Sequence, residues 1–153
     1  MRPMDWALLP FRRYFDFFGR SSRAEYWYFC ALTCLIGLVI LLGQLTLGES
    51  AQVPLMIVNG VFSLITLIPS AAVTVRRLHD INRSGFVALK YLIALVLAWI
   101  PIGAFMFFST VVVGIAVLAA AMICLKFLIL TITEGDRGPN PYGPNPYGLT
   151  YGY

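Results

Sequence analysis

The sequence has few charged residues, a single histidine and only three cysteines. Charged residues make up 12% of its 153 residues, whereas hydrophobic residues make up 59% and the mean hydropathy is +0.81. A water-soluble domain would leave too much of this apolar surface uncovered. Cys30, Cys34 and Cys124 all lie in apolar stretches, where a thiol behaves as a small hydrophobic group. We therefore expect neither a disulfide framework nor a metal site, and no cofactor.

Four long apolar stretches dominate what is present. They cover residues 26–47, 53–75, 86–108 and 110–133. Each has about the ~20 residues that a helix needs to cross a hydrocarbon layer of ~30 Å. The sequence therefore predicts an all-α, polytopic membrane protein with four transmembrane helices in a single membrane domain, residues 1–133. Residues 86–133 are nearly continuous, so the boundary between the third and fourth spans stays open.

Two of the three connections between these stretches contain no Lys or Arg. Residues 48–52 carry only Glu49 and residues 100–109 carry no charge, whereas every Lys and Arg belongs to the opposite ends of the spans or to the termini. Lys and Arg are enriched in cytoplasmic loops of membrane proteins. This pattern predicts a multi-pass membrane protein with both termini in the cytoplasm. Because the cations flank spans rather than forming a soluble patch, we expect no nucleic-acid partner.

The two ends of the chain differ in composition from the spans. Trp6, Leu9, Arg13 and Phe17 recur at helical spacing in the leader, although Pro10 interrupts the pattern. We expect an irregular start and a short interfacial helix from near Pro10, serving as a membrane-surface anchor or as a docking helix for a partner. Residues 134–153 contain the sequence PNPYG twice in succession. Such Pro/Gly-rich repetition predicts a flexible cytoplasmic tail.

Two polar clusters stand at span ends that we expect to share the cytoplasmic side. In the first, Ser22 and Glu25 have the spacing of a capping box at the start of a helix. In the second, Asp80 lies one helical turn from Arg76 and Arg77, and this favours internal ion pairing. We expect the two clusters to meet, because an unpaired carboxylate at this depth is costly. The clusters act as a positive anchor or form a site for anions, such as phospholipid headgroups.

The two clusters carry a resemblance to a known family. Residues 18–27 read FGRSSRAEYW and residues 76–85 read RRLHDINRSG. In that order they resemble the signature stretches of a family of small bacterial inner-membrane proteins of unknown function, typified by YhaH and YhaI. Residues 100–103 (IPIG) and 140–146 (NPYGPNP) resemble two further family elements. The resemblance implies an integral inner-membrane protein and names no activity.

The favoured function is non-enzymatic binding of anionic lipid headgroups or of a protein partner through an Arg-rich cytoplasmic face. Homo-oligomerisation is a further possibility, and a small transporter or channel subunit and a membrane enzyme acting on lipid phosphates are the alternatives. Neighbouring side chains on a helix point about 100° apart, so His79 and Asp80 do not form a catalytic pair there. We therefore predict no catalytic residue. The candidate binding residues are Arg20, Arg23, Glu25, Arg76, Arg77, His79, Asp80 and Arg83.

Overall fold

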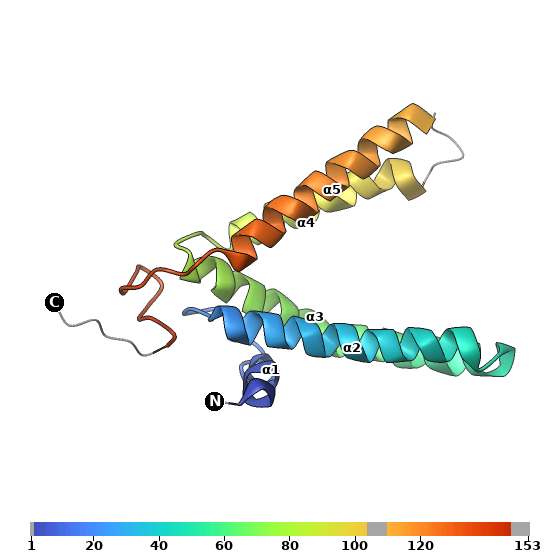
Figure 1. Ribbon diagram of the computed structural model, residues 1–153, viewed down its shortest axis with the longest axis horizontal. Coiled ribbons are helices and arrows are strands. Elements are labelled where there is room, and N and C mark those ends of the chain that lie inside the picture. Colours follow the sequence, from blue (N-terminus) through green and yellow to red (C-terminus); the bar gives the residue numbers. More distant parts are fainter. Residues whose placement is uncertain (1, 104–109, 148–153) are drawn as a thin grey trace.

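The computed structural model describes residues 2–103 and 110–147, and within these ranges the chain forms helices and no strand (Figure 1). This confirms the all-α class predicted from the sequence. In chain order the helices are α1 (Pro3–Arg12), α2 (Arg23–Thr46), α3 (Glu49–Asp80), α4 (Phe86–Gly103) and α5 (Thr110–Ile132).

Two helical hairpins diverge from a common end, as Figure 1 shows. One hairpin consists of α2 and α3, and its tight connection includes Gly48, whose φ of +76° favours glycine. The other consists of α4 and α5. We call the end at which α2 and α4 begin and α3 and α5 end the polar end. Helix α1 and the C-terminal segment, residues 133–147, both lie at this end (Figure 1).

Three of these helices are long and apolar enough to cross a membrane, namely α2, α3 and α5. The apolar stretch found in α4, Phe86–Ala98, is shorter. The number of four spans therefore stays a prediction. Helix α3 continues past the predicted span, residues 53–75, to Asp80. The proposed split near Ser109, and residues 104–108 of the third stretch, lie outside the described residues.

Large apolar side chains cover the outer surfaces of the hairpins. Leu45, Leu64, Leu97 and Leu118 are each at least 60% exposed. In water such a surface would be unstable, whereas in a bilayer it meets lipid tails of the same polarity. The buried apolar core is small and lies towards the polar end: it includes Tyr26, Phe29 and Val73, with Phe11 of α1 packed against them.

The leader helix differs from its prediction. Helix α1 begins at Pro3 and ends at Arg12, so Pro10 lies in its last turn rather than at its start. Pro3 suits the first helical position, where no amide donor is needed, and the Asp5 carboxylate accepts a hydrogen bond from the backbone N–H of Arg2 at 3.0 Å. Pro10 lies in the last turn and has no N–H to donate to the carbonyl oxygen of residue 6, yet the helix continues to Arg12. The prediction of an irregular start was therefore wrong.

The segment after α1 packs against α3 at a proline. Pro69 has no N–H, so the carbonyl oxygen of Ile65, four residues earlier, has no donor within the helix. The hydroxyl of Tyr14 donates a hydrogen bond to this oxygen at 2.8 Å. A residue from the leader thus satisfies the carbonyl that the proline leaves free and attaches the leader to α3.

A short turn, residues 81–85, connects the two hairpins. Asn82 adopts a positive φ of 55°, and the Ser84 hydroxyl accepts a hydrogen bond from the backbone N–H of Phe86 at the start of α4. A Cβ on Gly85 would approach Val75 of α3 to 2.8 Å. Glycine therefore allows α4 to begin close beside the end of α3.

Candidate functional site

Five charged side chains are buried together at the polar end. We call Arg20, Glu25, Arg76, Arg77 and Asp80 the arginine clasp. Their side chains are at most 3% exposed. Arg20 precedes α2, Glu25 lies in its first turn, and the others lie in the last turns of α3. The two polar clusters of the sequence therefore meet.

Glu25 pairs with Arg76 across the two helices. Nη2 of Arg76 donates to Oε1 of Glu25 at 2.7 Å, and Nη1 of Arg13 lies 3.8 Å from the other carboxylate oxygen. Arg76 also donates through Nη1 to the backbone carbonyl oxygens of Arg13 and Asp16. Ser22 caps α2 by accepting the N–H of Glu25, as predicted, but the Glu25 carboxylate binds Arg76. One guanidinium thus joins α2, α3 and the leader.

Asp80 is the shared acceptor of the other two arginines. Its Oδ1 accepts from Nε of Arg20 at 2.9 Å and lies 2.8 Å from Nη2 of the same side chain. Its Oδ2 accepts from Nη1 of Arg77, one turn earlier in α3. Both carboxylates of the clasp are therefore paired with arginine. Glu25 of α2 pairs with Arg76 of α3, and Asp80 pairs with Arg77 in its own helix and with Arg20, which precedes α2.

The remaining donors of the clasp bind backbone carbonyl groups of the C-terminal part. Arg77 donates through Nε to the carbonyl oxygen of Thr131 at 3.0 Å and through Nη2 to that of Thr133. Arg20 donates to the carbonyl oxygens of Asp136 and Gly138. The clasp has three guanidinium groups and only two carboxylates. The backbone carbonyl oxygens accept hydrogen bonds from N–H groups that the carboxylates leave unpaired. A buried charge is tolerated only with such partners. The clasp thus fastens both hairpins and the C-terminal segment.

Two buried polar atoms of this region have no partner within the described part of the chain. They are Nε of Arg76 and the hydroxyl oxygen of Ser21. The backbone N–H of Ser21 donates to the carbonyl oxygen of Arg76 at 3.1 Å, so both residues belong to the same contact. Each unsatisfied buried group costs about 1–3 kcal/mol, so the clasp gives up some stability for its geometry.

The C-terminal segment has a defined path against the clasp. The backbone N–H of Asp136 donates to the carbonyl oxygen of Asp80 at 2.9 Å, and the Asn140 side chain donates to that of His79 at 2.9 Å. A Cβ on Gly135 would come within 1.9 Å of Oδ2 of Asp80. Glycine is therefore required for this approach. The flexibility predicted for residues 134–153 stays a prediction, and residues 148–153 lie outside the described part.

The duplicated PNPYG sequence forms the same turn twice. The side-chain oxygens of Asn140 and Asn145 accept the backbone N–H of Tyr142 and Tyr147 at 3.0 and 2.9 Å. The two tyrosines have different neighbours, however. Tyr142 stacks on His79 with a centroid distance of 3.9 Å, whereas Tyr147 meets the edge of Trp6 in α1 at 6.3 Å. The repeat therefore connects the end of α3, at His79, with Trp6 of α1.

His79 contacts a backbone carbonyl group and a tyrosine ring. Its Nδ1 lies 3.1 Å from the carbonyl oxygen of Gly19, and its ring is covered by Tyr142. Asp80, its neighbour in sequence, binds Arg20 and Arg77 instead. The two side chains follow the divergence expected for adjacent positions of a helix. The arrangement places no acid–base pair here.

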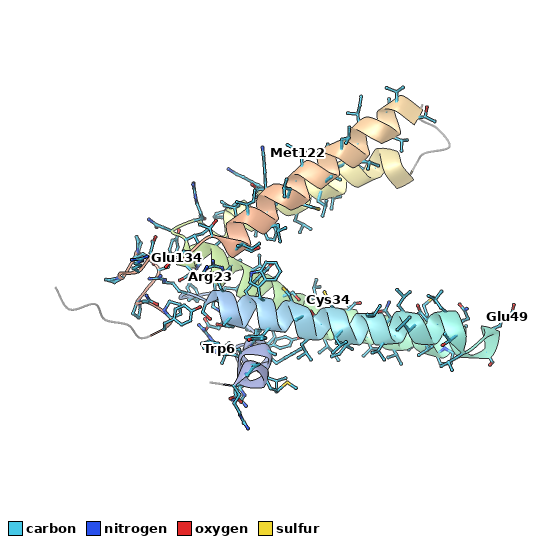
Figure 2. The ribbon with its side chains drawn as sticks, viewed as in Figure 1. Trp6, Arg23, Cys34, Glu49, Met122 and Glu134 are labelled. Atoms are coloured by element: carbon cyan, nitrogen blue, oxygen red, sulfur yellow. The ribbon has the colours of Figure 1, made fainter. Side chains whose placement is uncertain are left out.

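Arg23 and Arg83 are exposed, unlike the other candidate arginines. Figure 2 labels Arg23 at the polar end, close to Glu134. Arg23 and Glu134 line a small hollow of about 80 Å³ together with Arg137 and Tyr147. Arg83 follows the end of α3 in the connecting turn. The eight candidate residues therefore divide into the buried clasp, a covered His79 and two accessible arginines.

Sequence reasoning missed the carbonyl groups and the small residues that complete the site. Gly135, Gly138 and Asn140 meet clasp residues or their neighbours, yet the interpretation of a flexible tail left them out. The repeated Asn-Pro-Tyr-Gly sequence was the signal that could have found Asn140, because each copy encodes a specific side-chain-to-backbone turn. No pattern in the sequence indicates that Tyr14 reaches the carbonyl of Ile65.

Comparison with known proteins identifies a family that covers most of this chain. The family described as "Protein of unknown function (DUF805)" matches residues 14–144, which include both clusters and most of the C-terminal segment. The chain belongs to the DUF805 family. This confirms the resemblance inferred from the sequence.

Two Escherichia coli (strain K12) proteins are similar to this member of the DUF805 family. "Inner membrane protein YhaI" is 30% identical over 139 residues, which cover 91% of this chain and 92% of that protein. "Inner membrane protein YhaH" is 34% identical over 99 residues, which cover 65% of this chain and 81% of that protein. No solved structure gives a significant match. With its apolar helices, the chain fits an integral inner-membrane protein of unknown function.

Proposed function

We propose that this DUF805 protein is a four-span inner-membrane protein that binds anionic phospholipid headgroups at its cytoplasmic polar end. The observation that carries the proposal is the division of the cations there. The clasp arginines are buried and bound to protein acceptors, whereas Arg23, Arg83, Lys90 and Lys126 are exposed around them. Exposed cations at headgroup depth attract anionic lipids, each by about 1 kcal/mol.

The orientation follows from the same division. The connection of α2 to α3 contains no Lys or Arg, and neither do residues 100–109. The polar end carries the cations of the chain and is therefore the cytoplasmic end, with both termini beside it. Lys90 and Lys126 lie within about two turns of that end, so their long side chains reach the headgroup layer.

The clasp has a scaffolding part in this proposal. Its guanidinium groups hold the start of α2, the ends of α3 and α5 and the C-terminal segment in one arrangement. The exposed cations are then presented from fixed positions. Arg20, Arg76 and Arg77 support the lipid-binding surface without contacting a headgroup, which revises the role expected for them from the sequence.

The two alternative functions gain less support from the described residues. Asn59 of α3 is exposed on the helix surface, so it does not mark an internal path for a transported solute. An enzyme acting on lipid phosphates would need His79 as an acid or base. The His79 ring instead contacts the carbonyl oxygen of Gly19 and stacks on Tyr142. Binding of a headgroup without a reaction needs only the exposed arginine and lysine side chains.

Two matched double variants test the proposal. Native mass spectrometry of protein extracted from mixed anionic and zwitterionic membranes counts the lipids that stay bound. Arg23→Gln with Arg83→Gln should weaken anionic lipid retention by about 2 kcal/mol, a factor of about 30, without lowering the unfolding temperature much. Arg76→Gln with Arg77→Gln should instead lower the unfolding temperature.

A control and a contradicting result complete this test. Arg2→Gln removes an exposed cation that already pairs with Asp5 in α1, so it should change lipid retention little. Cysteine accessibility at positions 82 and 49, on the two sides expected for the membrane, reports whether insertion and orientation are intact. Unchanged anionic lipid retention in a correctly inserted Arg23→Gln/Arg83→Gln protein would overturn the proposal.

A further inference from the structure

An apolar crevice lies between the two hairpins, near the polar end where they diverge (Figure 1). Its volume is about 470 Å³. One wall belongs to α3 and includes Leu67 and Ala71, and the other belongs to α4 and α5 and includes Leu92, Cys124 and Phe127. All of these residues lie within apolar stretches. The crevice is therefore at the depth of the hydrocarbon layer, on the side of the bilayer that faces the polar end.

The clasp and the turn after α3 hold this crevice open. Arg77 fixes the end of α3 to the carbonyl oxygens of Thr131 and Thr133 at the end of α5. The short turn of residues 81–85 fixes the start of α4 beside the same point, where Gly85 contacts Val75. From this fixed vertex the walls separate along their length. These contacts at the vertex therefore set the shape of the crevice.

Water does not suit this space. Among the described lining residues, only Ser70, Thr74 and Tyr91 carry a hydroxyl group. The Ser70 hydroxyl already donates to the carbonyl oxygen of Thr66 at 2.6 Å. A bound water needs two to four polar partners, and an apolar cavity otherwise stays dry. Hydrocarbon is the medium that matches these walls.

The size of the crevice distinguishes a lipid tail from a helix. A helix with its side chains is about 10–12 Å wide and rises 5.4 Å per turn, so one turn occupies roughly 400–600 Å³. On α3 the crevice extends from Leu67 to Val75, about two and a half turns, whereas a transmembrane helix has five or more. An acyl chain is thin and flexible, and most of its length fits in the same volume.

We propose that one acyl chain of a phospholipid from the leaflet at the polar end occupies the crevice between α3 and the α4/α5 hairpin. This site is separate from the exposed cations, because it recognises the tail rather than the headgroup. It takes zwitterionic and anionic phospholipids alike. The acyl chain would act as a removable part of the protein interior, in the space that the clasp leaves between the hairpins.

Two alanines provide a matched pair of filling variants. Ala71 lines the crevice on α3, whereas Ala121 is exposed on α5 and does not line it. The protein is reconstituted in membranes of phosphatidylcholine alone and analysed by native mass spectrometry after extraction. The wild type and Ala121→Trp should each retain a phosphatidylcholine molecule, and Ala71→Trp should retain none. Equal retention by Ala71→Trp, or none by the wild type, overturns the proposal.

A second measurement keeps the test decisive when Ala71→Trp does not fold. Cys124 lines the crevice, so a spin label on it in a Cys30→Ala/Cys34→Ala protein reports what surrounds that site. The EPR spectrum of the label should be broadened by dipolar coupling to phospholipids that carry a second nitroxide on the tail, and the label should be shielded from a water-soluble nickel chelate. Access of the chelate, or label-to-label coupling between two copies, overturns the proposal.

These outcomes are independent of those for headgroup binding. Phosphatidylcholine has no net charge, so its retention does not rest on Arg23 or Arg83. Retention in pure phosphatidylcholine with no anionic preference elsewhere would support the tail site and contradict the headgroup proposal. An anionic preference with no lipid retained in pure phosphatidylcholine would support the headgroup proposal and contradict the tail site.

Discussion

At the polar end, five charged side chains are buried within a few ångströms of one another, whereas along the hairpin arms leucines are largely exposed. This inverts the arrangement of a soluble protein. In a bilayer the arms gain little from burying apolar groups, because lipid tails are equally apolar. Specific structure therefore has to come from polar contacts and from close packing. The arginine clasp supplies such contacts where the hairpins, the leader and the C-terminal segment converge.

The largest effect is expected for the shared acceptor of the clasp. Asp80→Asn leaves the guanidinium groups of Arg20 and Arg77 buried without their carboxylate. Removing one partner of a buried ion pair costs about 3–5 kcal/mol. Thermal unfolding in detergent should show this loss. Glu134→Gln, an exposed acid near the same end, is the control and should change the unfolding temperature little. Similar unfolding temperatures for both variants would mean that the clasp contributes little.

A smaller effect is expected from a single methyl group. Gly135→Ala places a Cβ where Asp80 now lies, within 1.9 Å of its Oδ2, so the C-terminal segment must move. Such overpacking typically costs about 1–3 kcal/mol. Gly138→Ala is the matched control, because no atom lies within 4 Å of its added Cβ. Thermal unfolding of the pair checks the result, and equal stability would show that residue 135 is not close to Asp80.

The contact between leader and arm predicts an intermediate loss and a rescue. Tyr14→Phe removes the hydrogen bond to the carbonyl oxygen of Ile65, at a cost of about 1 kcal/mol. In a Pro69→Ala protein an amide N–H can serve that carbonyl within α3, so the same Tyr14→Phe change should cost less. A double-mutant cycle of unfolding free energies measures the difference. Additive effects of the two changes would contradict this role of Tyr14.

The smallest effect concerns pH and lies outside the spans. Partial burial raises the pKa of Asp16, but hydrogen bonds from Arg13 and from the N–H of Phe18 lower it further, so the net pKa is below the ordinary 3.8. Its stabilising effect is therefore present above that value and is lost as pH falls through the lower pKa of the folded protein. Asp16→Asn should cost about 0.5 kcal/mol at pH 7, because the pair is partly exposed. Unfolding measured at a pH below the pKa of Asp16 in the folded protein should show no difference between the two proteins.

The sequence indicated the polar end better than the arms. Helix periodicity placed Asp80 one turn from Arg76 and Arg77, and the cost of an unpaired carboxylate indicated that Glu25 would find an arginine. The sequence also indicated the Ser22 cap. These features depend on local spacing and on charge. Such information is present in any short stretch of sequence.

The remainder depends on contacts between distant residues. The start of α1 was predicted wrongly because Pro10 was taken as a first-turn residue, while Pro3 and Asp5 provide the actual helix start. The angle between the hairpins and the crevice within it follow from the bonds of Arg77 to the end of α5. Backbone carbonyl groups have no sequence signature, so these acceptors could not be identified in advance.

Hydrogen–deuterium exchange of residues 134–147 tests the clasp most directly. The amide of Asp136 donates to Asp80, and that of Gly143 donates to Asn140. The account predicts that these amides exchange slowly in the wild-type protein in a bilayer, and quickly in Asp80→Asn. Exchange at the rate of an unfolded chain in the wild type would contradict it. The segment would then be the flexible tail that its proline and glycine content suggests, and the clasp would hold only the helices.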